Sequence, residues 1–279
     1  MGEEGWAGLP SLAPPIPYPS SLRMALDPAS LIRLALVFAR VSGVVTAAPL
    51  FSQRAVPVQV RVMLAVLLSL ILVGFAGPDL PPHADHPVGF VVAVAVEVLT
   101  GLLIGYAVRF VFWAVEFAGE LIGFQMSLSM AQVYNPMTGS SENPLGRLVS
   151  MAFLLLFLLL DGPQAVVVGM ARSFLAVPLG GADLGAGGPL LLSWTGGFFE
   201  TAVRLAMPFL VALFLVDVGL GVFARVVPQA DLFSISLPLK LLAGLAVSIA
   251  FVASFWPLAP VLVDGATAGL DALFAALAP

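Results

Sequence analysis

Long, nearly uninterrupted runs of apolar residues limit what this chain can fold into. Residues 88–108, for example, contain a single charged side chain, that of Glu97. A transmembrane helix needs about 20 consecutive, predominantly apolar residues to cross the hydrocarbon core of a bilayer. The chain is 60% hydrophobic and 10% charged, whereas soluble domains carry about 25% charged residues. The sequence therefore predicts an all-α integral membrane protein.

About six apolar helical segments are expected, joined as hairpins. Their approximate extents are residues 29–50, 58–75, 88–109, 148–160 (followed by a further apolar piece, 165–177), 192–220 (interrupted at Pro208) and 237–262. The glycine-rich segment 178–190 is expected to be a non-helical connector, and residues 263–278 a short amphipathic tail. Residues 1–28 include the stretch SLAPPIPYPS, whose prolines favour a flexible, extended tail. Residues 29–279 are expected to form a single helical domain.

The central stretch of the chain, residues 116–147, is too polar for an ordinary membrane span. Its first half, up to Ala131, follows a helical pattern. Its second half contains Asn135-Pro136 and Gly139, and Asn-Pro pairs favour turns and disfavour helix at the Asn. Irregular backbone at membrane depth is tolerated only where protein covers it or where it lines an aqueous cavity. We therefore expect a broken central helix, followed by a loop that lies on a conduit.

Three charged side chains stand inside apolar segments and are expected to be buried. They are Arg40, Glu97 and Asp217. A charge at the centre of a membrane helix costs about 2.5–3.5 kcal/mol on insertion scales. Arg40 is therefore expected either to snorkel or to pair with a carboxylate of another helix, and the alternative is that it lines a polar path. Glu97 could pair with an arginine elsewhere in the chain.

Two pairs of glycines are spaced four residues apart. They are Gly101 with Gly105, and Gly119 with Gly123. Residues at this spacing share one face of a helix, and small residues there allow two helix backbones to approach closely. The spacing predicts helix packing at these four positions.

Residue patterns typical of catalytic or metal sites are missing from the sequence. The chain has no cysteine, which excludes disulfides and thiolate metal sites. Its two histidines, His83 and His86, lie in one proline-rich loop and do not form a recognised ligand set. A glycine-rich phosphate loop with its lysine is also missing. We expect no enzymatic activity, no cofactor and no bound metal.

Four motifs occur in an order that resembles a known family. The motifs are FARVSGVVTAAPLFSQRAVPVQVRVMLA, GELIGFQMSLSMAQVYNP, LLLDGP and GLGVFARVVPQADLFSISLPLK. In these motifs the chain resembles the FliR family, the export-gate subunit of flagellar type III secretion, whose injectisome counterpart is called SctT. The likeness extends over about residues 30–260. The sequences of the first two motifs are more similar to those of the flagellar branch.

The resemblance implies a subunit of the protein export gate in the bacterial inner membrane, within the flagellar basal body. One copy would join FliP- and FliQ-like proteins around an entry pore for unfolded export substrates. FlhB- and FlhA-like proteins and membrane lipid would be further partners, and no nucleic acid is implied. The alternatives are an injectisome gate subunit and a small-solute secondary transporter. Transporters usually show paired repeats with helix breaks at matching positions, and here only residues 134–144 form a strong break.

The resemblance also implies that residues 125–134 plug the pore. The constriction would include Gln125, Met126, Ser127, Met130, Val133 and Tyr134, with Asn135, Pro136 and Gly139 as its hinge. Methionine is unbranched and polarizable and adapts to varied surfaces, and an apolar constriction can close by dewetting. The alternative is that Met126 and Met130 are ordinary packing residues. The family tends to have Gly where Ser127 stands, Phe where Met130 stands and Asp where Asn135 stands.

Overall fold

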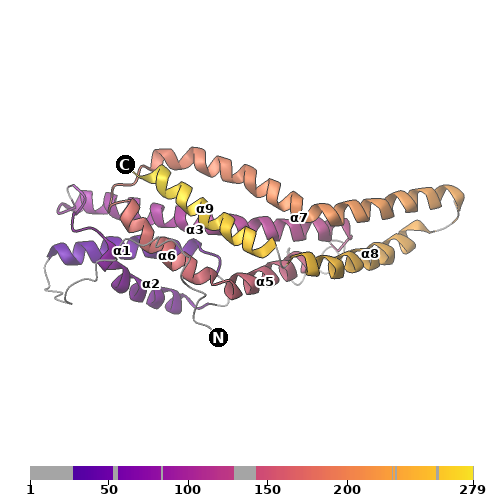
Figure 1. Cartoon of the computed structure of the whole chain (residues 1–279), viewed down its shortest axis with the longest axis horizontal. Helices are drawn as coiled ribbons and strands as arrows, with labels where there is room; N and C mark the ends of the chain where they lie inside the picture. Colours follow the sequence, from indigo (N-terminus) through magenta and orange to yellow (C-terminus); the bar gives the residue numbers. More distant parts are fainter. Residues whose placement is uncertain are drawn as a thin grey trace, which may run out of the picture.

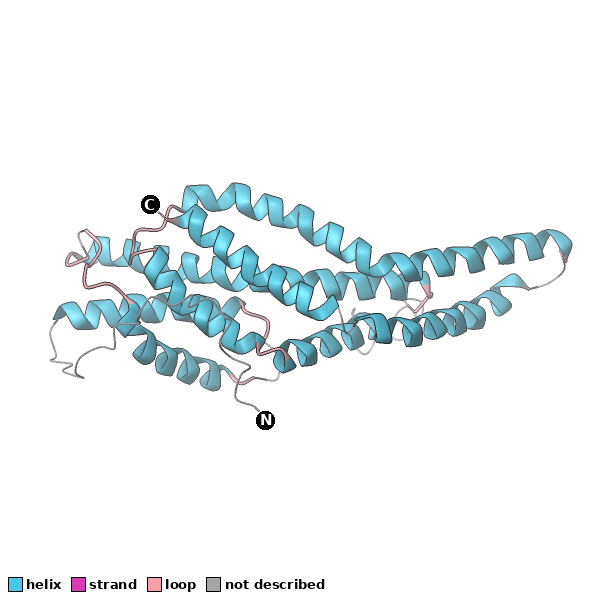
Figure 2. Cartoon of the chain, in the orientation of Figure 1, coloured by secondary structure: helices cyan, strands magenta, loops and turns pink. Residues whose placement is uncertain are grey.

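The computed structural model describes residues 28–52, 56–82, 84–128, 143–227, 229, 231–255 and 258–278. Every regular element among these residues is a helix (Figure 2), which confirms the predicted all-α fold. The elements are α1 (Pro28–Ala47), α2 (Val58–Leu72), the short 3-10 helix η1 (Val73–Phe75), α3 (Pro87–Gln125), α5 (Pro144–Leu159), α6 (Gly162–Ala176), α7 (Leu184–Val226), α8 (Leu232–Phe255) and α9 (Leu258–Leu277). Most of the predicted tail (residues 1–27) and the central loop (residues 129–142) lie outside the described residues.

Four helical segments are long and apolar enough to cross a membrane. They are α1, α2 continued through η1, α3 and α7. Helices α5 and α6 pass the same test together but are bent by 68° at the break between them. The described residues thus hold four candidate spans, or five with the bent pair, where about six were expected. The expected segment 237–262 corresponds to most of α8 and the first turn of α9.

Two segments that were expected to be non-helical or interrupted are continuous helix in α7. The helix begins at Leu184 inside the glycine-rich segment, because the Asp183 side chain caps it by accepting a hydrogen bond from the Gly185 amide at 2.9 Å. It also continues through Pro208. Proline is tolerated in membrane helices where neighbouring groups satisfy the freed carbonyl.

The C-terminal segment is packed helix rather than a surface tail. It forms α9, a helix of 20 residues. Its largest buried side chains are Leu270, Leu273, Phe274 and Leu277. These residues recur every three or four positions, so one face of α9 is apolar and joins the core.

The break between α5 and α6 is made by three consecutive residues. Asp161 adopts the left-handed conformation, with φ 56°. A Cβ on Gly162 would lie 2.5 Å from the ring of Phe157, so only glycine fits there. Pro163 then lies in the first turn of α6, where its missing amide hydrogen is not needed.

Helix α3 is the central helix of the fold and packs against α1, α5, α7 and α9 (Figure 1). Its contact with α1 brings the two backbones together. A Cβ on Gly101 would overlap the carbonyl oxygen of Arg40, and one on Gly105 would lie 2.5 Å from the Cβ of Ala47. Both glycines therefore lie at the helix–helix contact that their spacing predicts.

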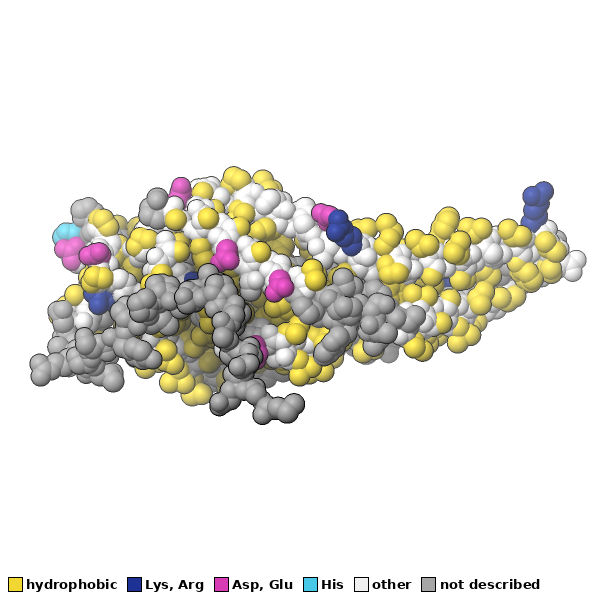
Figure 3. Space-filling view, viewed as in Figure 1, with side chains coloured by type: hydrophobic (Ala, Val, Ile, Leu, Met, Phe, Trp, Pro, Cys, Tyr) yellow, Lys and Arg dark blue, Asp and Glu magenta, His cyan; other side chains and the backbone are white. Residues whose placement is uncertain are grey.

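Helices α7 and α8 form a hairpin that projects beyond the other helices (Figure 1). At about 1.5 Å per residue, α7 with its 43 residues is roughly 65 Å long, about twice the ~30 Å hydrocarbon core of a bilayer. Hydrophobic side chains are exposed along the hairpin (Figure 3). They include Val211, Phe214, Leu215, Val218, Val222, Leu239, Leu242 and Leu245. An apolar surface of this extent marks a contact with lipid or with another protein.

Candidate functional site

The described part of the predicted plug is the C-terminal end of α3. The helix ends at Gln125, and Ser127 is in the left-handed conformation with φ 62°. The Ser127 amide donates to the Phe124 carbonyl and the Leu128 amide donates to the Gly123 carbonyl, both at 3.0 Å. This pair of hydrogen bonds is the Schellman motif that ends many helices. Position 127 is therefore one where glycine is favoured, and this chain has serine there.

The side chain of Gln125 is bound to the projecting hairpin. Its Nε2 donates a hydrogen bond to Oδ2 of Asp217 on α7 at 3.2 Å. The other carboxylate oxygen, Oδ1, pairs with Nζ of Lys240 on α8 at 2.6 Å. The Asp217 side chain is 35% exposed, not buried as expected, because the hairpin projects past the helices that would cover it. Three helices thus meet at one carboxylate.

Met126 packs into the same hairpin. Its side chain is 1% exposed and lies on the backbone of Gly244 in α8, where any Cβ would overlap its Sδ and Cε atoms. Gly244 follows Lys240 by four residues, so the two share a face of α8. The described contacts of Met126 are therefore packing contacts at the base of the central loop.

The end of α3 and the start of α5, which flank the central loop in the sequence, lie against each other. In α3, a Cβ on Gly119 would lie 2.7 Å from the Cα of Gly146 in α5, and one on Gly123 would overlap the Asn143 side chain. Asn143 in turn caps α5 by accepting a hydrogen bond from the Leu145 amide at 3.0 Å. The helices that flank the loop are thereby held backbone to backbone. The remaining predicted plug and hinge residues lie in the loop, outside the described residues: Met130, Val133, Tyr134, Asn135, Pro136 and Gly139.

The other two predicted buried charges, Arg40 and Glu97, pair with each other. The Arg40 Nε lies 2.5 Å from Glu97 Oε2, and Nη2 lies 3.0 Å from Oε1. The guanidinium also donates to the carbonyls of Ser173 and Val177, at 2.9 and 3.0 Å. Glu97 accepts a further hydrogen bond from the Gly180 amide at 2.6 Å. The structure thus supports pairing of Arg40 with a carboxylate of another helix, and the pair ties α1 and α3 to the end of α6.

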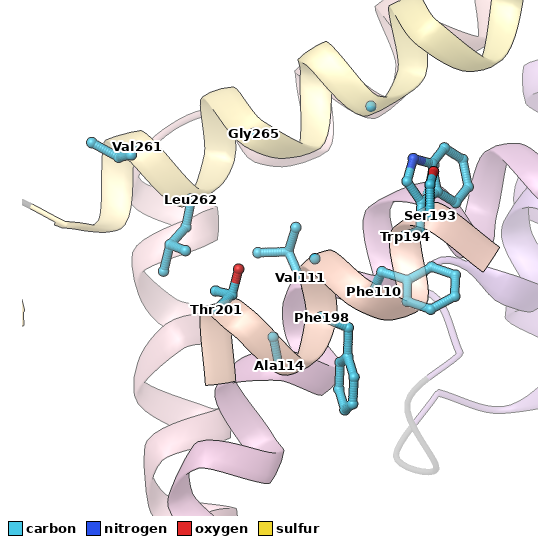
Figure 4. Close-up of a pocket in the computed structure, with 13 residues that line it drawn as sticks. Phe110, Val111, Ala114, Ser193, Trp194, Phe198, Thr201, Val261, Leu262 and Gly265 are labelled. Carbon is cyan, nitrogen blue, oxygen red and sulfur yellow. The ribbon is translucent and has the colours of Figure 1, made fainter. Parts of the chain in front are cut away.

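An apolar crevice of about 310 Å³ lies between α3, α7 and α9 (Figure 4). Its walls include Phe110 from α3, Trp194 from α7 and Leu262 from α9. No charged side chain is among its lining residues, and its hydroxyl groups are those of Ser193 and Thr201. A wall of this composition suits hydrocarbon or another helix better than a polar substrate, which would need several well-placed polar groups.

Sequence reasoning missed three residues that hold the end of α3. Lys240 is the single lysine of the chain and stands in an apolar helix, which is a signal for a paired charge. Asn143 directly precedes Pro144, and Asn before a first-turn Pro is a known start signal for a helix. Gly244 carries no sequence signal of its own, because its partner Met126 is distant in the chain.

Comparison with known proteins finds relatives along most of the chain. A sequence model of the family described as "Bacterial export proteins, family 1" matches residues 31–265. A protein titled flagellar biosynthetic protein FliR, from Escherichia coli strain K12, is 34% identical over 215 residues, which is 76% of this chain and 80% of the relative. The protein of the same title from Bacillus subtilis strain 168 is 32% identical over 210 residues, or 74% and 80%. That from Caulobacter vibrioides is 30% identical over 226 residues, or 80% and 90%.

Proposed function

This chain belongs to the FliR family of bacterial export proteins, and from that premise we propose that it helps to form and to plug the pore of the flagellar type III protein export gate. It is a multi-pass membrane protein and a structural component of the flagellar export apparatus. In the proposed role, unfolded substrates leave the cytoplasm through this pore during flagellum assembly. The proposal assigns the chain no catalytic step.

The anchored end of α3 is the observation that carries the plug. A resting gate must stop water and ions and yet yield to a polypeptide of any sequence. A short segment held at both ends by rigid helices meets both needs, since the segment can move while its supports stay fixed. The flanks of the central loop offer such supports, because Gly123 of α3 lies against Asn143 at the start of α5. The residues proposed to seal the pore, Met130 to Tyr134, come a few positions after this support in the sequence.

We place the protein in the inner membrane, at the flagellar basal body. FliP-, FliQ-, FlhB- and FlhA-like proteins are the proposed partners. The exposed apolar side chains of the α7–α8 hairpin support an assembly, because such a surface requires lipid or protein to cover it. Co-purification with FliP- and FliQ-like proteins tests this placement.

An injectisome gate subunit is the second candidate. The titles of the relatives above, all flagellar, favour the flagellar system. Deletion of the gene should abolish filaments and swimming, and the wild-type gene should restore both. Normal swimming of the deletion strain, together with loss of contact-dependent secretion, would assign the chain to an injectisome instead.

The plug is tested by replacing Met130 and Tyr134 with Ala in the complete gate. The closed gate should then leak ions, because two of its large sealing side chains are gone, and the membrane potential of resting cells should fall. Leu192→Ala is the matched control, since it removes an apolar side chain that is 76% exposed near the other end of α7. An undiminished potential in cells whose double variant is fully assembled would contradict the plug.

A further inference from the structure

We propose that Asp217, Lys240 and Gly244 form a latch that fixes the end of α3 and so positions the central loop. This role rests on the plug function proposed above. It gives the α7–α8 hairpin a task beyond contact with lipid or partners. The latch consists of one ion pair, one hydrogen bond and one packing contact.

The ion pair stands alone in an apolar hairpin. Between Arg204 and Arg225, α7 has one charged residue, Asp217, and α8 has one, Lys240. Their 2.6 Å contact joins the two helices of the hairpin. Ionisable side chains in apolar membrane segments are rare and usually serve a function. Here the second oxygen of Asp217 is turned to Gln125, so the pair is directed at the end of α3.

The packing contact lies one helical turn further along α8. Met126 fills the space above Gly244, and no other residue type fits at that position without displacing it. Gln125 and Met126 are consecutive, so two neighbouring residues at the end of α3 are held by different chemistry, the first by Asp217 of α7 and the second by Gly244 of α8. The hydrogen bond of Gln125 fixes the direction in which the end of α3 points, and the packing of Met126 fixes how closely that end approaches α8. Together they define both the position and the orientation from which the chain leaves α3.

This arrangement divides the predicted plug into two parts. Gln125 and Met126 are positioning residues, because their side chains are engaged inside the subunit. Closure of the pore then falls to the residues of the central loop, which begins three residues after Met126. The hairpin holds the end of α3 and also projects beyond it. A protein or lipid that packs on the hairpin can therefore shift the point from which the central loop starts.

The test uses the complete gate in cells, with the leak of ions through the resting gate as the readout. Asp217→Asn and Lys240→Met each break the ion pair. We expect either change to raise the leak about tenfold, between the small effect of breaking an exposed pair and the large effect of breaking a buried one. The swap Asp217→Lys with Lys240→Asp restores a pair of opposite charges, and it should return the leak to near the wild-type level.

Two controls separate the latch from general damage. Glu200→Gln breaks another 2.6 Å ion pair on α7, with Arg204, whose side chains are 61% and 78% exposed, and it should leave the leak unchanged. Gly244→Ala alters no charge but pushes on Met126, so it should open the gate as the charge variants do. Gly219→Ala is its match, because a Cβ there meets nothing within 4 Å.

Assembly of each variant is measured by co-purification with the FliP-like partner, and only assembled gates are compared. If Met130 and Tyr134 variants leak while assembled Asp217→Asn and Gly244→Ala gates stay tight, the latch is wrong and the plug stands. If none of these variants leaks, the plug is wrong and the latch falls with it. A swap variant that leaks as much as the single variants also overturns the latch.

Discussion

The guanidinium of Arg40 and the carboxylate of Glu97 form a two-point ion pair in which neither side chain is more than 1% exposed. Removing two charges from water is offset by their attraction only when the remaining polar atoms also find partners. The carbonyls of Ser173 and Val177 and the amide of Gly180 supply those partners. The pair therefore orders three segments of the chain, and neither charge can be removed without exposing the other to apolar surroundings.

Loss of one partner of this pair should be strongly destabilising. We expect Glu97→Ala to lower the free energy of unfolding by about 3–5 kcal/mol, because an uncompensated guanidinium is left in the core. The double variant Arg40→Met with Glu97→Met should lose less stability than the sum of the losses in the single variants Arg40→Met and Glu97→Met. Thermal unfolding of the purified gate in detergent measures the difference. Arg172→Met is the control, since its 3.8 Å contact with Asp271 is more than half exposed; losses that simply add would argue against the coupling.

Lysine should not replace Arg40. Arg40→Lys keeps the charge, but an ammonium group cannot bind both carboxylate oxygens and the carbonyls of Ser173 and Val177 in the geometry of the planar guanidinium. It also loses the stacking of the guanidinium on the Phe174 ring, whose centroid is 4.5 Å away. We expect a stability loss of about 2–3 kcal/mol, measured in the same unfolding experiment. Wild-type stability of the lysine variant would show that charge alone suffices.

The contact between α1 and α3 should not tolerate a methyl group. Gly101→Ala places a Cβ on the carbonyl oxygen of Arg40, so the helices must separate, at an expected loss of about 1–3 kcal/mol. Gly196→Ala is the matched change in α7, where a Cβ meets nothing within 4 Å. That change should raise stability by about 0.4–1 kcal/mol, since alanine restricts the unfolded chain. Equal effects of the two substitutions would refute the close approach.

Glycine should suit position 127 better than the serine now present. Ser127 has a φ of 62°, a conformation that is unfavourable by about 1–2 kcal/mol for a residue with a Cβ. Ser127→Gly should therefore stabilise the end of α3 by about 1 kcal/mol. Ser193→Gly, inside α7, should have the opposite sign because glycine weakens a helix interior. Unfolding temperatures of the two variants give the answer, and a loss of stability in Ser127→Gly would contradict the strain.

Much of this fold follows from the sequence, because apolar runs and prolines set the helix ends. The expected segments 29–50 and 58–75 correspond closely to α1 and to α2 with η1. The spacing of Gly101 and Gly105 predicts their place at the contact with α1, since residues four apart share a helix face. Periodicity describes one helix at a time, however. It does not show which face of α8 meets α3, so the contacts of Lys240 and Gly244 emerge only from the folded chain.

Two of the predictions that failed, both in α7, have a common physical origin. Pro208 and the glycines near residue 185 are helix breakers in water, but α7 continues through both. In lipid an unpaired backbone group has no water to bind, so helix is favoured even where propensity is poor. Asp217 is partly exposed for a different reason, namely that the chain alone does not cover its own hairpin.

The length of α7 has a consequence for how cells must make this protein. A helix of roughly 65 Å that crosses the membrane cannot lie along its whole length within a hydrocarbon core about half as thick. The part of α7 outside the hydrocarbon core carries apolar side chains, and partner subunits must cover these side chains to keep them from water. Production of this subunit is therefore tied to the supply of its companions: synthesised alone it should aggregate or be degraded, and its cellular lifetime should rise with the amount of the other subunits.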